Sequence, residues 1–66
     1  MKFIRLTASG RKAKEYYLKP QDFVFISVES GKTHVHLYFD RIGFKEIMVE
    51  QTPEEINELY ADAMNN

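Results

Sequence analysis

Two histidines are the nearest approach to a reactive pair in this sequence. His34 and His36 alternate with apolar residues in the segment THVHLYF, so on a β-strand both imidazoles leave the same face. Imidazoles at this spacing can bind a metal ion, with an oxygen of Tyr38 or Glu29 as a further ligand. The alternative is that both histidines are polar positions on the solvent side of the strand. Because no third nitrogen or sulfur ligand is evident, we expect neither a metal nor a cofactor.

Other catalytic patterns are missing from the sequence. The 66 residues contain no cysteine, which excludes disulfides, thiolate metal sites and a cysteine nucleophile. There is no G-x-S-x-G segment for a serine nucleophile, and the three glycines are isolated, so no phosphate-binding loop is present. The paired carboxylates Glu54 and Glu55 are explained by helix capping. We therefore predict that the protein is not an enzyme and takes no small-molecule substrate.

Aromatic side chains are the most informative part of the composition. Five Phe and four Tyr make up 14% of the chain. Several of them alternate away from the apolar face of their strands, where a solvated sheet face ordinarily carries Thr, Lys and Glu. Phe3 and Tyr17 are further candidate members of this face. Exposed apolar patches of this kind mark interfaces, whereas the alternative is a set of incidental surface aromatics or a face covered by the N-terminal residues. We predict an interaction surface, for self-association or for a protein partner, made of Phe23, Phe25, His34, His36, Tyr38 and Met48.

Charge is divided along the chain. Residues 1–22 hold six basic and two acidic side chains, whereas residues 45–66 hold one basic and six acidic ones. This division predicts a basic hairpin and an acidic helix. An alternative function is nucleic-acid binding, in which Arg11, Lys12 and Lys14 contact phosphates while aromatic rings stack on bases. We favour it less, because the pI of 6.1 is low for a nucleic-acid-binding protein.

The secondary structure that would position these side chains follows from two periodicities. Alternation of apolar and polar residues predicts five strands, at about residues 2–7, 14–18, 23–29, 33–39 and 44–50. A helix is predicted from residue 53 to about residue 64. Thr52 can cap it, Pro53 suits its first position, and Glu55 can close a capping box. Its apolar side chains then recur at the helical period, at Ile56, Leu59, Tyr60 and Ala63.

These elements predict one α+β domain over residues 1–66. We expect an antiparallel meander of four to five strands with the C-terminal helix packed on one face. The residues expected on that inner face are Ile4, Leu6, Tyr16, Leu18, Val24, Ile26, Val28, Val35, Leu37, Ile47 and Val49. One helix covers only one side of such a sheet, and a chain of this size buries only about 60% of its unfolded surface. Both considerations favour a homo-oligomer.

Several segments resemble a known family. YYLKPQDFVFI, THVHLYF and IMVEQTPEEINEL are similar to segments of the FlbD-type family of small flagellar-operon proteins, and of small proteins from bacterial mobile elements. Leu18 and Pro20 match the middle of the family's pattern, and its last helix begins with a motif matched by Val49, Glu50, Thr52, Glu54, Glu55 and Ile56. The resemblance implies a small α+β fold of bacterial or phage type, and it brings no catalytic residue.

The chain shows no sign of a membrane segment. No apolar run approaches the roughly 20 residues of a membrane helix, and Arg5 interrupts the apolar residues near the start. Together with the lack of cysteine, this predicts a cytoplasmic protein without a membrane partner.

Overall fold

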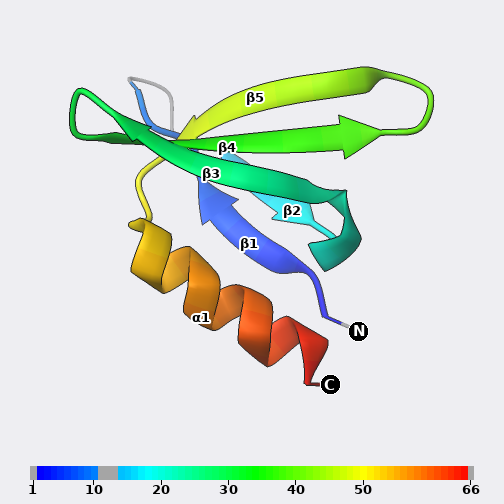
Figure 1. Ribbon diagram of the computed structural model, residues 1–66. Coiled ribbons are helices and arrows are strands. Elements are labelled where there is room, and N and C mark those ends of the chain that lie inside the picture. Colours follow the sequence, from blue (N-terminus) through cyan, green and yellow to red (C-terminus); the bar gives the residue numbers. More distant parts are fainter. Residues whose placement is uncertain (1, 11–13, 66) are drawn as a thin grey trace.

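The computed structural model describes residues 2–10 and 14–65, which form an α+β fold (Figure 1). The elements in chain order are β1 (Ile4–Thr7), β2 (Glu15–Leu18), the short 3₁₀ helix η1 (Pro20–Asp22), β3 (Phe23–Glu29), β4 (Lys32–Phe39), β5 (Gly43–Val49) and α1 (Pro53–Met64). In Figure 1, β3, β4 and β5 form one layer, and β1, β2 and α1 lie on the same side of it. The predicted fold class, antiparallel strands with one C-terminal helix, is confirmed at this level.

The strands do not form the single meander that the alternation predicts. They form two antiparallel sheets, one of β1 and β2 and one in the order β3-β4-β5. The two sheets meet at a corner, where Ala8 makes an isolated bridge to Val49 and the Glu50 N–H donates to the Thr7 carbonyl at 2.9 Å. Alternation reports which face a side chain takes but carries no information about the partner of a strand. The division into two sheets is therefore decided by long-range pairing.

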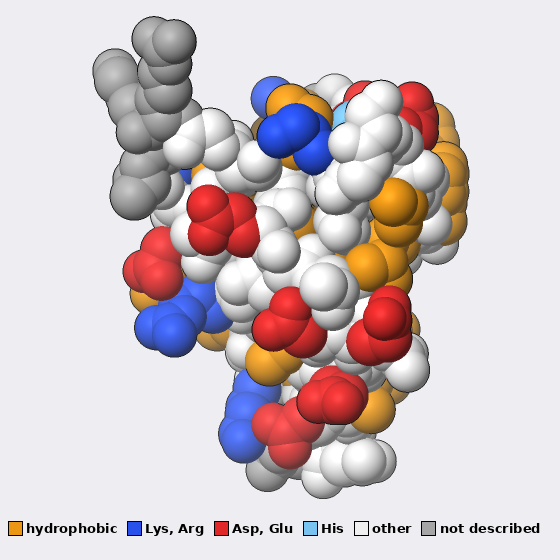
Figure 2. Space-filling model, turned by 90° about the vertical axis from the view of Figure 1, so that its left-hand side faces the viewer, with side chains coloured by type: hydrophobic (Ala, Val, Ile, Leu, Met, Phe, Trp, Pro, Cys, Tyr) orange, Lys and Arg blue, Asp and Glu red, His pale blue; other side chains and the backbone are white. Residues whose placement is uncertain are grey.

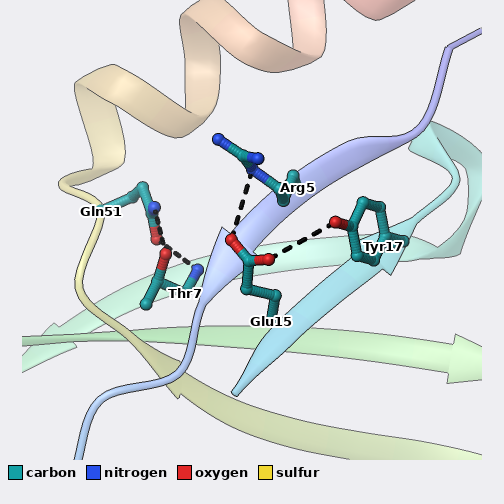
Figure 3. A network of polar contacts seen from close by, with 5 residues as sticks. All are labelled: Arg5, Thr7, Glu15, Tyr17 and Gln51. Carbon is teal, nitrogen blue, oxygen red and sulfur yellow. Dashed lines mark hydrogen bonds and ion pairs between the residues drawn. The ribbon is translucent and has the colours of Figure 1, made fainter. Parts of the chain in front are cut away.

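A glutamine side chain reinforces this corner (Figure 3). The Thr7 N–H donates to Gln51 Oε1 at 2.9 Å, and Gln51 Nε2 donates to Thr7 Oγ1 at 3.2 Å. Gln51 lies between β5 and α1. Its side-chain amide accepts from the backbone of β1 as the carbonyl of a neighbouring strand would, on the edge of β1 that does not pair with β2. The outer surface of β1 and β2 mixes charged and aromatic side chains: Glu15 lies between Arg5 and the hydroxyl of the exposed Tyr17, at 3.5 and 3.4 Å.

The helix begins where the sequence predicts. The Glu55 N–H donates to Thr52 Oγ1 at 3.2 Å, and the Thr52 N–H donates to Glu55 Oε1 at 2.9 Å, which completes the capping box. Pro53 occupies the first helical position, where no N–H is needed. Ile56 and Ala63 are buried on the inner side of the helix. These signals act between residues three or four apart, so the sequence alone is sufficient to place this element.

The core lies between the two sheets and the helix. Its buried apolar residues are Ile4, Leu6, Leu18, Val35, Leu37, Val49, Ile56 and Ala63, and every strand residue among them belongs to the predicted inner face. Tyr16, Ile26 and Ile47 are half-buried against this cluster. The helix and the β1–β2 pair thus cover the inner face together.

The sequence predicts Phe23 on the outer face of the sheet and Val24 on its inner face, and both predictions are wrong. A β-bulge shifts the register, so that Phe23 is opposite Leu37 whereas Phe25 is opposite His36. One extra residue in the strand reverses the face of every residue before it. Phe23 therefore turns to the inner side, and Val24 is left 50% exposed.

The inward position of Phe23 is filled by an aromatic contact. Its ring meets Tyr60 of α1 edge to face, with centroids 5.9 Å apart. Val28, another residue predicted in the core, remains on the inner side but is 56% exposed, because it lies on the edge strand next to the hairpin.

Candidate interaction surface

The outer side of the three-stranded sheet gathers most of the predicted interface. Cross-strand pairing places Phe25 beside His36, His34 beside Met48, and Tyr38 beside Phe44. We call this outer surface the aromatic face; its members are Phe25, Ser27, His34, His36, Tyr38, Phe44, Glu46 and Met48.

The large side chains of the aromatic face are open to solvent. Phe25 is 54% exposed, Tyr38 43%, Phe44 78% and Met48 45%. The exposed area of these four residues together is that of about two whole aromatic side chains, or about 400 Å² of mostly apolar surface. A patch of this size is among the largest on a typical monomer and is often functional.

Ring contacts hold part of this surface in place. Phe25 stacks on His36 with centroids 3.9 Å apart and planes 14° apart, and Tyr38 meets Phe44 at 4.9 Å and 60°. These side chains therefore lose little rotational freedom when a partner covers them, which favours binding.

A polar cluster lies among the aromatic side chains. His34 Nδ1 is 2.9 Å from Glu46 Oε2, and His36 Nε2 is 3.6 Å from the same oxygen. The Ser27 hydroxyl is 3.1 Å from His36 Nε2. Because a carboxylate only accepts, we assign the His34 proton to Nδ1, which donates to Glu46.

This cluster differs from the metal site that the sequence suggested as an alternative. Glu46, rather than Tyr38 or Glu29, contacts the two imidazoles. Within residues 2–10 and 14–65, no group of three His, Asp or Glu side chains is arranged to hold a metal ion. We therefore interpret the cluster as a polar centre whose side chains contact and hydrogen-bond one another within the sheet surface.

The structure separates the predicted interface residues into two groups. Five of the six, all except Phe23, lie on the aromatic face. Phe44 and Glu46 belong to this face but were missed. Both lie an even number of residues from Met48 in the same strand, so alternation places them on the same face and is sufficient to predict them.

The residues of the alternative nucleic-acid site are only partly placed. Arg11 and Lys12 lie outside the described residues. Lys14 is exposed, and its Nζ lies 5.3 Å from the centre of the Tyr16 ring. Since Tyr16 is half-buried against the core, that ring does not stand free to stack on a base.

Comparisons with protein-family models, with curated proteins and with solved structures gave no match. The resemblance to the FlbD-type family therefore stays a prediction. None of the described residues belongs to a helix with the length and apolar character needed to cross a bilayer.

Proposed function

We propose that this protein is a small, non-enzymatic assembly protein that self-associates through the aromatic face. The observation that carries the proposal is the exposure of Phe25, Tyr38, Phe44 and Met48 on one sheet surface, around the polar cluster and opposite the core. Such a surface loses contact with water when a second apolar surface covers it.

The polar centre of the aromatic face is compatible with burial. A charge moved out of water is costly unless it is paired and hydrogen-bonded. Glu46 already has His34 and His36 beside it, so covering the face leaves no carboxylate without a partner. The hydrogen bonds are made within one copy and do not depend on the partner.

The outer surface of α1 is unsuited to the same role. Glu54, Glu55, Glu58 and Asp62 are exposed along this helix, and Figure 2 shows acidic side chains spread over the lower half of the molecule. Two copies that met through α1 would place like charges together, which disfavours that arrangement. The aromatic face has a single acidic side chain, which is internally paired.

The area predicts the strength of association. A standard interface buries about 800 Å² on each partner. The aromatic side chains provide about half of this area, at about 400 Å². We therefore expect self-association that depends on concentration rather than a permanent dimer.

Sedimentation equilibrium over a range of concentrations tests the proposal with two matched variants. Phe44→Ser removes the most exposed ring of the aromatic face, which is 78% exposed. Phe3→Ser is the control, because it removes a ring that is 61% exposed but precedes β1 and lies outside the aromatic face. The expected result is a mass that rises with concentration for the wild type and for Phe3→Ser, and a weaker rise for Phe44→Ser. A wild-type protein that stays monomeric up to millimolar concentration would overturn the proposal, as would equal effects of the two variants.

A further inference from the structure

Strand β3 forms a free edge of the three-stranded sheet. The sheet order is β3-β4-β5, and in the described part of the chain no backbone hydrogen bond joins the outer side of β3 to another segment. The turn of the β3–β4 hairpin shows which backbone N–H and C=O groups of β3 point away from β4. Its two turn residues, Ser30 and Gly31, have φ of 53° and 73°, as in a type I′ turn. In that turn Glu29 and Lys32 are a hydrogen-bonded pair, so alternation directs the N–H and C=O groups of Ile26 and Val28 outward.

The other open edges carry features that discourage strand pairing. Strand β2 has four residues and is flanked by Lys14 and Lys19. Strand β5 includes Lys45 and Glu46, and its last part is covered by the Ser9 N–H, which donates to the Met48 carbonyl at 2.9 Å. Charged residues and short length are the usual protection of an edge strand.

Strand β3 lacks this protection over most of its length. It has seven residues, and from Phe23 to Val28 none is charged and none is proline. The bulge at Val24 bends only its first part. The straight segment from Phe25 to Glu29 therefore presents an apolar, unpaired edge.

We propose that β3 pairs with β3 of a second copy, antiparallel and about a two-fold axis at Ser27, to form a six-stranded sheet. Ser27 is the middle of the straight segment, so the pairing is self-complementary and closed, as a two-fold interface requires. Ile26 of one copy faces Val28 of the other, and each of these pairs exchanges two backbone hydrogen bonds.

Side-chain exposure and charge fit this arrangement. Val28 is 56% exposed on the inner side of the sheet, where it would pack against Ile26 of the other copy. The two copies of Glu29 would be separated by about four residues of strand, or about 14 Å, which exceeds the screening length of about 8 Å at physiological ionic strength. Like-charge repulsion therefore does not oppose the pairing.

The pairing also addresses the small size of the aromatic face. The two copies would present their aromatic faces on the same side of one continuous sheet. The joined surface would offer about 800 Å² of exposed apolar side chains, the contribution of one partner to a standard interface. This inference goes beyond the proposed function and does not require it, because edge pairing leaves the aromatic face uncovered.

Amide hydrogen exchange measured by NMR at low and high protein concentration tests the pairing. The N–H groups of Phe25 and Ser27 point to β4 and should be protected at every concentration. Those of Ile26 and Val28 should become protected only as the protein associates. Rapid exchange of both outward amides at all concentrations would refute the pairing.

Two variants separate this interface from the aromatic face. Val28→Lys places a charge on the edge at an exposed position and should weaken association roughly tenfold or more, whereas Val28→Thr should preserve it. If Phe44→Ser removes association while the outward amides stay open, the edge pairing fails and the proposed function stands. If Val28→Lys removes it and Phe44→Ser does not, the pairing stands and the proposed function fails.

Crosslinking provides an independent measurement, because the chain has no cysteine of its own. On the two-fold axis, the two Cα atoms of residue 27 would be about 4.5 Å apart, which permits a disulfide. Ser27→Cys should therefore oxidise to a dimer. Within the edge-paired dimer Met48→Cys should not, because five strand spacings, about 24 Å, would separate its two copies. Efficient dimerisation of Met48→Cys without that of Ser27→Cys would contradict the edge pairing.

Discussion

The Gln51 side chain connects the two sheets and α1, and replacing it with alanine tests how the corner is held. Gln51→Ala removes the hydrogen bond from the Thr7 N–H at 2.9 Å and the bond to Thr7 Oγ1 at 3.2 Å. Both bonds are partly buried, and each contributes about 1 kcal/mol net. The expected loss in the free energy of unfolding is therefore about 2 kcal/mol.

This loss is large for a chain of 66 residues. Stability of about 0.05–0.15 kcal/mol per residue implies a total of about 3–10 kcal/mol. In a domain of this size, a loss of about 2 kcal/mol lowers the midpoint of thermal unfolding by roughly 10 °C. Urea denaturation followed by far-ultraviolet circular dichroism measures the free energy, and a thermal scan measures the midpoint.

Two further variants make the result specific. Gln21→Ala removes an exposed amide of the same size from η1 and should change stability by less than about 0.5 kcal/mol. Thr7→Val removes the side-chain acceptor but keeps the backbone N–H, so a double-mutant cycle with Gln51→Ala should give a coupling of about 1 kcal/mol. If Gln51→Ala costs no more than Gln21→Ala, the backbone bonds alone hold the corner and the reasoning is refuted.

The remaining predictions concern the bulge and the alternative function. Phe23→Ala should lower the free energy of unfolding by about 3 kcal/mol because its ring packs between the core and Tyr60, whereas Phe25→Ala should cost only about 1 kcal/mol through its ring stack; equal losses in urea denaturation would mean that the bulge does not reverse the two faces. The wild-type protein, with a pI of 6.1, should not bind a heparin column at low salt; retention that disappears when Lys14 and its basic neighbours are neutralised would favour the nucleic-acid alternative instead.

The candidate surface was partly accessible from the sequence. Alternation along THVHLYF correctly places His34, His36 and Tyr38 on one face, because successive side chains of a strand always point to opposite sides. The same argument fails at Phe23, where one extra residue in the strand changes the parity. The partner of the two imidazoles was also missed, because Glu46 reaches them from another strand.

The sequence by itself determined the features that depend on near neighbours. The helix at Pro53–Met64 follows from a capping box between residues three apart, and most of the buried strand residues follow from a period of two. Only the tertiary structure decided that the strands divide into two sheets, that Ala8 and Gln51 hold the corner between them, and that β3 is left at an edge. These features depend on hydrogen bonds and packing between segments far apart in the chain, and local periodicity contains no record of which segments meet.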